Sequence, residues 1–189
     1  MDSPRRLYML PFDHRDSFEH RLFGFTGALD SEETSQIVDA KRVIYERFLL
    51  ALESDVPRDA AAILVDEQSG REVLRDAKAH GLMTTCPVER SGEKEFTFEY
   101  GNDFPAHIED VDPTFCKALV RYNAEGDLAL NRRQCERLHR LSDSLSKHDR
   151  SFLVELLVPS EPHQLGGPGL SSKREPRVAS LRRPSRRKP

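Results

Sequence analysis

Five short apolar segments recur along the chain, and each is followed by polar or charged residues. Segments of this length are typical of β-strands, and stretches with apolar residues at helical spacing separate them. Strand and helix therefore alternate, which indicates a parallel sheet covered by helices. The expected strands are residues 7–12, 61–67, 82–88, 115–122 and 152–158.

The intervening helices are predicted from apolar periodicity and from end signals. Ser31 is a plausible N-cap for the first long helix, with Glu32 and Glu33 in its first turn, where the helix dipole favours acids. The expected helices are residues 31–54, 70–78, 104–109 and 131–148.

Two α/β architectures fit this alternation: an open doubly wound sheet, or part of a closed (β/α)8 TIM barrel. No G-x-G-x-x-G motif follows the first strand and the chain has no Walker loop, so a nucleotide-binding open sheet is not favoured. A complete barrel usually needs about 250 residues, whereas this chain has 189. The sequence therefore predicts a partial (β/α)8 barrel of about five strand–helix units.

Charge divides the chain into two parts. Residues 163–189 contain eight Lys and Arg but one acid, a net charge of +7, so residues 1–162 carry −10. From about residue 166 the sequence is rich in Gly, Pro, Ser and Arg without a hydrophobic period, and we expect a disordered basic tail over 166–189 behind a barrel domain over 1–165. The acidic body disfavours nucleic acid, and a basic run is usually solvated, so no nucleic-acid partner is expected.

The sequence has no apolar run of about 18 residues and no N-terminal signal peptide, so neither membrane association nor secretion is expected. Its three cysteines are odd in number and lack C-x-x-C spacing. Reduced thiols and a cytoplasmic location are the expectation.

Candidate site residues come from the carboxyl ends of the strands, where α/β barrels gather their chemistry. Lys117 and Glu155 lie within apolar stretches of the fourth and fifth strands, so each must be paired or neutral. Because these strands are neighbours, the two side chains can meet. The pair is either a proton-transfer device or a satisfied buried ion pair, and the sequence leaves both open.

The other strand ends supply weaker candidates. Asp13 is a candidate catalytic acid or a helix N-cap, and the neighbouring Arg15 is a candidate anion-binding residue. Asp66 could bind substrate or metal, or could be a solvated strand end, and Arg121 is a further substrate-binding candidate. His14 alone among the histidines follows a strand, so neither a metal nor another cofactor is expected.

Several multi-residue motifs occur together and in order over residues 7–164. They are FDHR (12–15), AKRVIYE (40–46), ILVDEQSG (63–70), FEYG (98–101), DPTFCKALVRYN (112–123), NRRQ (131–134) and FLVELLVP (152–159). Together they resemble the aldolase-like domain often fused behind 5-dehydro-2-deoxygluconokinase in inositol catabolism. That domain is similar in turn to tagatose 1,6-bisphosphate aldolase, a Schiff-base barrel enzyme.

The resemblance implies retro-aldol cleavage of a phosphorylated keto sugar acid, 6-phospho-5-dehydro-2-deoxygluconate, to dihydroxyacetone phosphate and malonate semialdehyde. It also implies a kinase domain as the partner in fused relatives. By its motifs, the family's acid–base glutamate falls on Glu155, the lysine beside the Schiff base on Lys117, and the first-strand aspartate on Asp13.

The chain departs from this family at one point of chemical importance. The family's Schiff-base lysine lies on the sixth strand in a segment like D-V-x-K-x-E, and the sequence has no such segment. A Schiff-base aldolase needs that amine as its electron sink. The expectation is therefore an aldolase-type but inactive, C-terminally truncated chain, with a non-catalytic fragment or the companion domain of the kinase as the alternatives.

Overall fold

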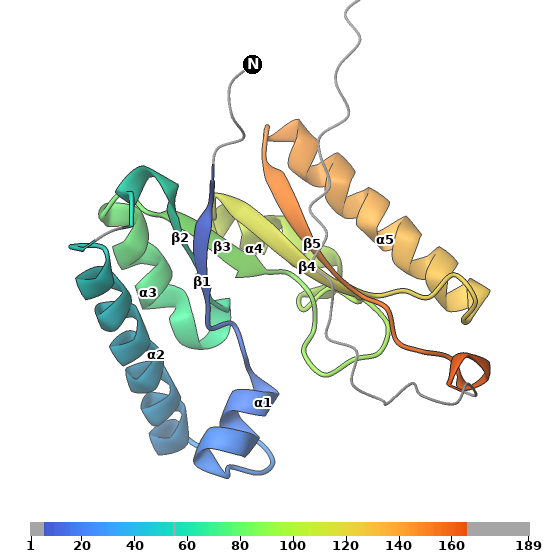
Figure 1. Ribbon diagram of the computed structural model, residues 1–189, viewed down its shortest axis with the longest axis horizontal. Coiled ribbons are helices and arrows are strands. Elements are labelled where there is room, and N and C mark those ends of the chain that lie inside the picture. Colours follow the sequence, from blue (N-terminus) through green and yellow to red (C-terminus); the bar gives the residue numbers. More distant parts are fainter. Residues whose placement is uncertain (1–5, 55, 166–189) are drawn as a thin grey trace, which may run out of the picture.

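The structure is a computed structural model and describes residues 6–54 and 56–165. Its five strands form one parallel sheet in the order β1-β2-β3-β4-β5 (Figure 1). They are β1 (Tyr8–Pro11), β2 (Ala61–Leu64), β3 (Met83–Pro87), β4 (Phe115–Arg121) and β5 (Ser151–Leu157). This confirms the five strands predicted from the sequence. The predicted tail, 166–189, lies outside the described residues.

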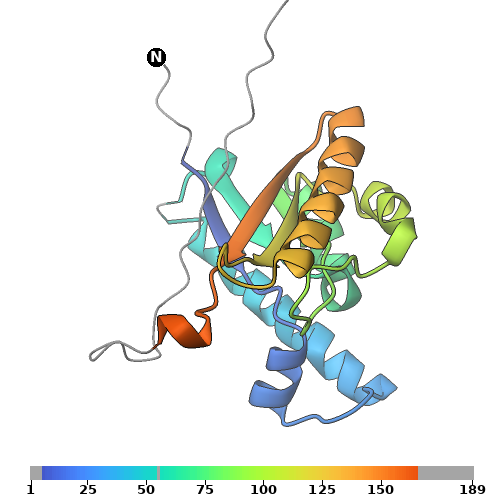
Figure 2. The same cartoon turned by 90° about the vertical axis from the view of Figure 1, so that its right-hand side faces the viewer.

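The sheet curls into a half-barrel, with its longest helices on the convex side (Figures 1 and 2). These helices are α2 (Ser31–Ala51), α3 (Glu67–Ala79), α4 (Phe104–Val111) and α5 (Leu128–Lys147). Shorter helical segments connect them: α1 (Asp16–Phe18), η1 (Glu19–Phe23), η2 (Arg58–Ala60), η3 (Gly101–Asp103) and η4 (Pro162–Gln164). No helix within the described ranges is long and apolar enough to cross a membrane.

Alternation along β4 separates the helix-covered side of the sheet from its concave side. Cys116, Ala118 and Val120 are buried in a hydrophobic cluster with residues of α4 and α5. Successive side chains of a strand point to opposite faces, so Lys117 and Arg121 face the concave side. A second cluster packs β1, β2 and β3 against α2 and α3. The concave side is thus the place where this fold presents charged groups.

Aspartates cap three of the long helices, and this corrects one expected N-cap residue and two expected helix starts. Asp30, not Ser31, caps α2: its carboxylate accepts from the backbone N–H groups of Glu32 and Glu33, and the Glu33 side chain accepts from the Asp30 N–H. Asp66 caps α3 and Asp127 caps α5, so both helices begin three residues earlier than predicted.

Gly70 allows α3 to lie close against β2. A Cβ atom at this position would lie 2.3 Å from a methyl group of Val65, which is completely buried. The absent side chain therefore lets the first turn of α3 approach the end of β2.

Candidate functional site

The concave side of the sheet holds an open cavity of about 620 Å³. The carboxyl-terminal halves of the strands and the loops that follow them form its walls. This is the end of the sheet at which (β/α)8 proteins carry their sites. Its charged lining residues are Asp13, Arg15, Asp16, Glu89, Arg90, Glu93, Glu95, Lys117, Arg121 and Glu155.

Lys117 lies at the centre of the charged groups in this cavity. Its Nζ atom is 3.0 Å from Asp13 Oδ2, 2.9 Å from Glu89 Oε1 and 3.0 Å from Glu155 Oε2. The lysine side chain is only 6% exposed, whereas Glu155 is 34% exposed. The structure therefore brings together the three residues named as catalytic candidates, and it adds a fourth, Glu89.

The surrounding carboxylates determine the charge of Lys117. Burial by itself lowers the pKa of the ammonium, but the negative charges of Glu89, Asp13 and Glu155 outweigh burial and raise that pKa above its ordinary value. Burial raises the pKa of Glu89, and the charges of Lys117 and Arg15 oppose that rise. Lys117 is thus a fixed cation at neutral pH, and its amine is not free to act as a nucleophile.

Arg15 lines the cavity, but its guanidinium is already occupied by the protein. Nη2 donates to the backbone oxygen of Glu89 at 2.8 Å, and Nη1 donates to Glu99 Oε2 at 3.0 Å. Arg15 Nη2 also lies 3.5 Å from the Glu89 carboxylate. The residue predicted to bind substrate therefore holds Glu89 in place beside Lys117.

Asp66, also predicted to bind substrate, lies outside the residues that line the cavity. It is 1% exposed and is paired with Lys41 of α2, which is completely buried. Its second oxygen accepts from the Ser69 N–H and caps α3. Asp66 is therefore not a solvated strand end, and its contacts join α2 to the start of α3.

Lys41 and Glu89 are the buried charges of the described residues that were not among the predicted site residues. The buried residues of α2 are Ile37, Lys41 and Tyr45, which recur every four residues on one face. That spacing could have identified Lys41 from the sequence, because a charged residue on a buried helix face needs a partner. Glu89 directly follows an apolar strand, yet nothing in the sequence shows that it lies beside Lys117, 28 residues further along.

The loop after β3 forms one wall of the cavity and is anchored to β4 and α5. The Arg121 guanidinium donates to the Glu93 backbone oxygen, and Gln134 of α5 accepts from the Phe96 N–H. Arg133 and Arg137 both donate to Glu95, and these hydrogen bonds lower its pKa to about 2. The wall is therefore fixed by side chains that come from later in the chain.

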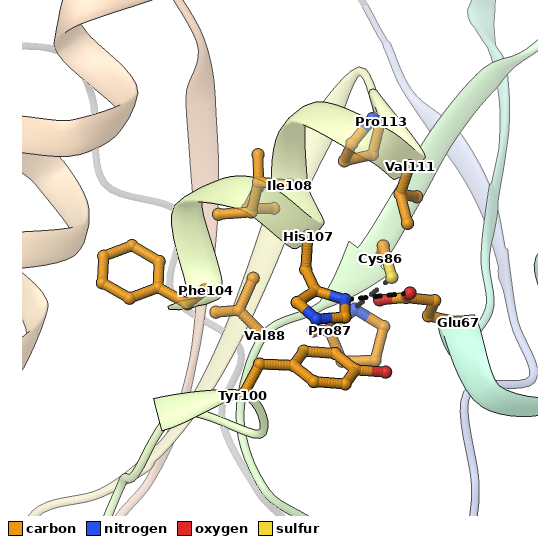
Figure 3. Close-up of a pocket in the computed structure, with 11 residues that line it drawn as sticks. Glu67, Cys86, Pro87, Val88, Tyr100, Phe104, His107, Ile108, Val111 and Pro113 are labelled. Carbon is orange, nitrogen blue, oxygen red and sulfur yellow. Dashed lines mark hydrogen bonds and ion pairs between the residues drawn. The ribbon is translucent and has the colours of Figure 1, made fainter. Parts of the chain in front are cut away.

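A smaller pocket of about 20 Å³ lies on the helix-covered side, between β3 and α4 (Figure 3). The rings of His107 and Tyr100 stack with centroids 3.4 Å apart, and His107 Nδ1 lies 3.2 Å from Glu67 Oε1. The Cys86 thiol also lines this pocket, and burial raises its pKa well above the ordinary value. A space of this size holds about one water molecule, so the large cavity is the candidate functional site.

No group of three or more His, Cys, Asp or Glu side chains that could hold a metal ion occurs in residues 6–54 and 56–165. Cys86, Cys116 and Cys135 are all free thiols, and the first two are buried packing residues.

No curated protein matches the sequence. Residues 2–170 match a protein family with the description "uncharacterized protein conserved in bacteria", DUF2090. The match spans the half-barrel sheet, its helices and every charged residue of the cavity. The chain therefore belongs to the DUF2090 family.

Proposed function

We propose that the concave cavity is a ligand-binding site of the sugar-phosphate aldolase type. Its proposed ligand is a phosphorylated keto sugar acid such as 6-phospho-5-dehydro-2-deoxygluconate. The observation that carries the proposal is the convergence of Asp13, Glu89 and Glu155 on Lys117 in an open cavity. The sequence motifs that resemble the aldolase-like domain contribute three of these four residues.

The cluster offers the proton-transfer half of retro-aldol chemistry. Cleavage begins when a base removes the proton of the hydroxyl group on the β-carbon. The C–C bond then breaks as the alkoxide becomes the carbonyl group of one product. The electron pair of the broken bond forms a double bond to the carbonyl carbon of the other fragment, the π electrons of that carbonyl move onto its oxygen, and protonation of the α-carbon completes the cleavage. Glu155, the most exposed carboxylate beside Lys117, is the proposed base, and the Lys117 ammonium donates a hydrogen bond to the carbonyl oxygen. Asp13 and Glu89 hold that ammonium in position.

The electron sink is the part of this chemistry that Lys117 does not supply. A Schiff base forms only from a neutral amine, whereas the three carboxylates keep Lys117 protonated. Lys117 is also the one lysine among the lining residues of the cavity in the described part of the chain. We therefore propose that this chain binds its ligand and does not turn it over.

We expect dihydroxyacetone phosphate, one of the two cleavage products, to bind the full chain saturably in a calorimetric titration. The variant Lys117→Arg keeps the positive charge between the carboxylates but moves the donor atoms. It should lower the affinity about tenfold or more, the effect of one charge-assisted hydrogen bond. Lys78→Arg, on the exposed surface of α3, should bind as the wild type does. Absence of binding, or equal affinity in Lys117→Arg, would contradict the proposed site.

The same mixture treated with borohydride tests the charge state of Lys117. Borohydride reduces an imine to a stable amine, so a Schiff base appears as a mass increase on a lysine-containing peptide. The fixed ammonium predicts no adduct on Lys117. An adduct there would show that the chain uses Lys117 as its nucleophile, and the non-catalytic part of the proposal would then be wrong.

A further inference from the structure

Arg121 differs from the other cations of the cavity in the charge around it. Arg15 is paired with Glu89 and Glu99, Lys117 with three carboxylates, and Arg90 with Glu93 at 3.6 Å. The guanidinium of Arg121 has a backbone oxygen, that of Glu93, as its partner at 2.7 Å. Within the described chain, no carboxylate forms an ion pair with Arg121, so its charge is not compensated by the protein.

The acidic neighbours of Arg121 are held by other groups. The Glu93 carboxylate accepts from the Thr97 hydroxyl and pairs with Arg90, while the Glu95 carboxylate accepts from Arg133 and Arg137. Each of these contacts gives an acidic side chain of the loop a partner other than Arg121. The guanidinium is half-buried, keeps several N–H groups beyond the one bound to Glu93, and lines the open cavity.

The position of Arg121 on β4 favours the longer arm of a ligand whose carbonyl group is bound at Lys117. Lys117, Leu119 and Arg121 line the cavity from one strand, and the strand rise of roughly 3.3 Å per residue separates the Cα atoms of Lys117 and Arg121 by about 13 Å. In the proposed ligand the phosphate oxygens lie four bonds from the carbonyl carbon and the carboxylate oxygens lie five bonds from it, so the carboxylate arm is the longer of the two. With the carbonyl at Lys117, we place the longer arm over Leu119 and its carboxylate at Arg121.

We infer that Arg121 is a carboxylate subsite, which selects sugar acids over sugars that end in a hydroxymethyl group. This inference rests on the proposed function. The planar guanidinium fork matches the two oxygens of a carboxylate. Its anchoring to the Glu93 backbone oxygen fixes the fork before the ligand arrives.

Two probes, 6-phosphogluconate and glucitol 6-phosphate, differ only at C1, which is a carboxylate in the first and a hydroxymethyl group in the second. The full-length wild type should bind 6-phosphogluconate at least about tenfold more tightly than glucitol 6-phosphate, as expected for a charge-assisted hydrogen bond to the carboxylate. Arg121→Gln should bind the two probes with affinities equal within about twofold, so that this discrimination is lost. Arg132→Gln removes the same charge from the exposed side of α5, outside the cavity, and should behave as the wild type.

Retained affinity of Arg121→Gln for glucitol 6-phosphate also shows that the variant is folded, and Arg121→Lys should recover part of the discrimination. Unchanged discrimination in Arg121→Gln would overturn the carboxylate subsite and leave the proposed function intact. Arg121→Gln could instead lose affinity for both phosphorylated probes and bind gluconate, which has no phosphate, as the wild type does. That result would place the phosphate at Arg121 and would likewise overturn the carboxylate subsite. If the wild type bound neither probe nor dihydroxyacetone phosphate, the proposed function itself would be wrong.

Discussion

Replacement of Lys117 by Met should destabilise the fold by about 3–5 kcal/mol, the usual cost of removing one partner from a buried ion cluster. Methionine fills a similar volume but leaves Asp13, Glu89 and Glu155 facing one another without a cation. Glu89 is buried, so its charge has little access to water. Urea unfolding at neutral pH measures the free-energy difference directly.

Two further variants separate this effect from the loss of any lysine. Lys78 forms an exposed ion pair with Asp112, and Lys78→Met should cost less than about 1 kcal/mol. Adding Glu89→Gln to Lys117→Met removes the buried negative charge and should recover part of the lost stability. If Lys117→Met lost no more stability than Lys78→Met, the ion cluster would not be the organising feature of this cavity.

Asp66→Ala should be comparably destabilising, although Asp66 lies outside the cavity. The change leaves the completely buried Lys41 without its carboxylate, at about 3–5 kcal/mol, and also removes the N-cap of α3. Asp30→Ala measures the contribution of an N-cap alone to the free energy of unfolding. It removes an exposed N-cap from α2 and should cost about 1 kcal/mol. Equal losses in the two variants would show that the Lys41–Asp66 pair contributes nothing.

The double variant Lys41→Met with Asp66→Ala addresses the role that the sequence predicted for Asp66. Removing both charges should restore part of the stability lost in Asp66→Ala, because no buried ion is then left unpaired. The double variant should also bind dihydroxyacetone phosphate as the wild type does. A selective loss of ligand affinity there would return Asp66 to the substrate-binding residues.

The contact between Lys117 and Glu155 was predictable because its causes are local and general. A charge on an apolar strand needs a partner, and consecutive strands of a β/α chain usually lie side by side. The structure confirms both steps, since β4 pairs with β5 and the two side chains are 3.0 Å apart. Asp13 could be placed near them because the carboxyl ends of parallel strands share one edge of the sheet.

Other parts of the site depend on contacts that no local pattern encodes. Arg15 was predicted to bind an anion, yet Glu99, 84 residues later, occupies part of its guanidinium. The anchoring of Glu95 by Arg133 and Arg137 spans about forty residues and crosses from a loop to a helix. The pairing of Asp66 was not predictable for a related reason: its partner, Lys41, lies on the buried face of α2, where the sequence shows a charge among apolar residues but not which residue it contacts.

A crystal structure of the full chain with 6-phospho-5-dehydro-2-deoxygluconate tests the proposed site most directly. We expect an intact ligand in the concave cavity, with its carbonyl oxygen about 3 Å from Lys117 Nζ, as in an ordinary hydrogen bond, and with its carboxylate on Arg121. A covalent bond between the ligand and Lys117, or a ligand bound elsewhere while the cavity holds only solvent, would contradict it.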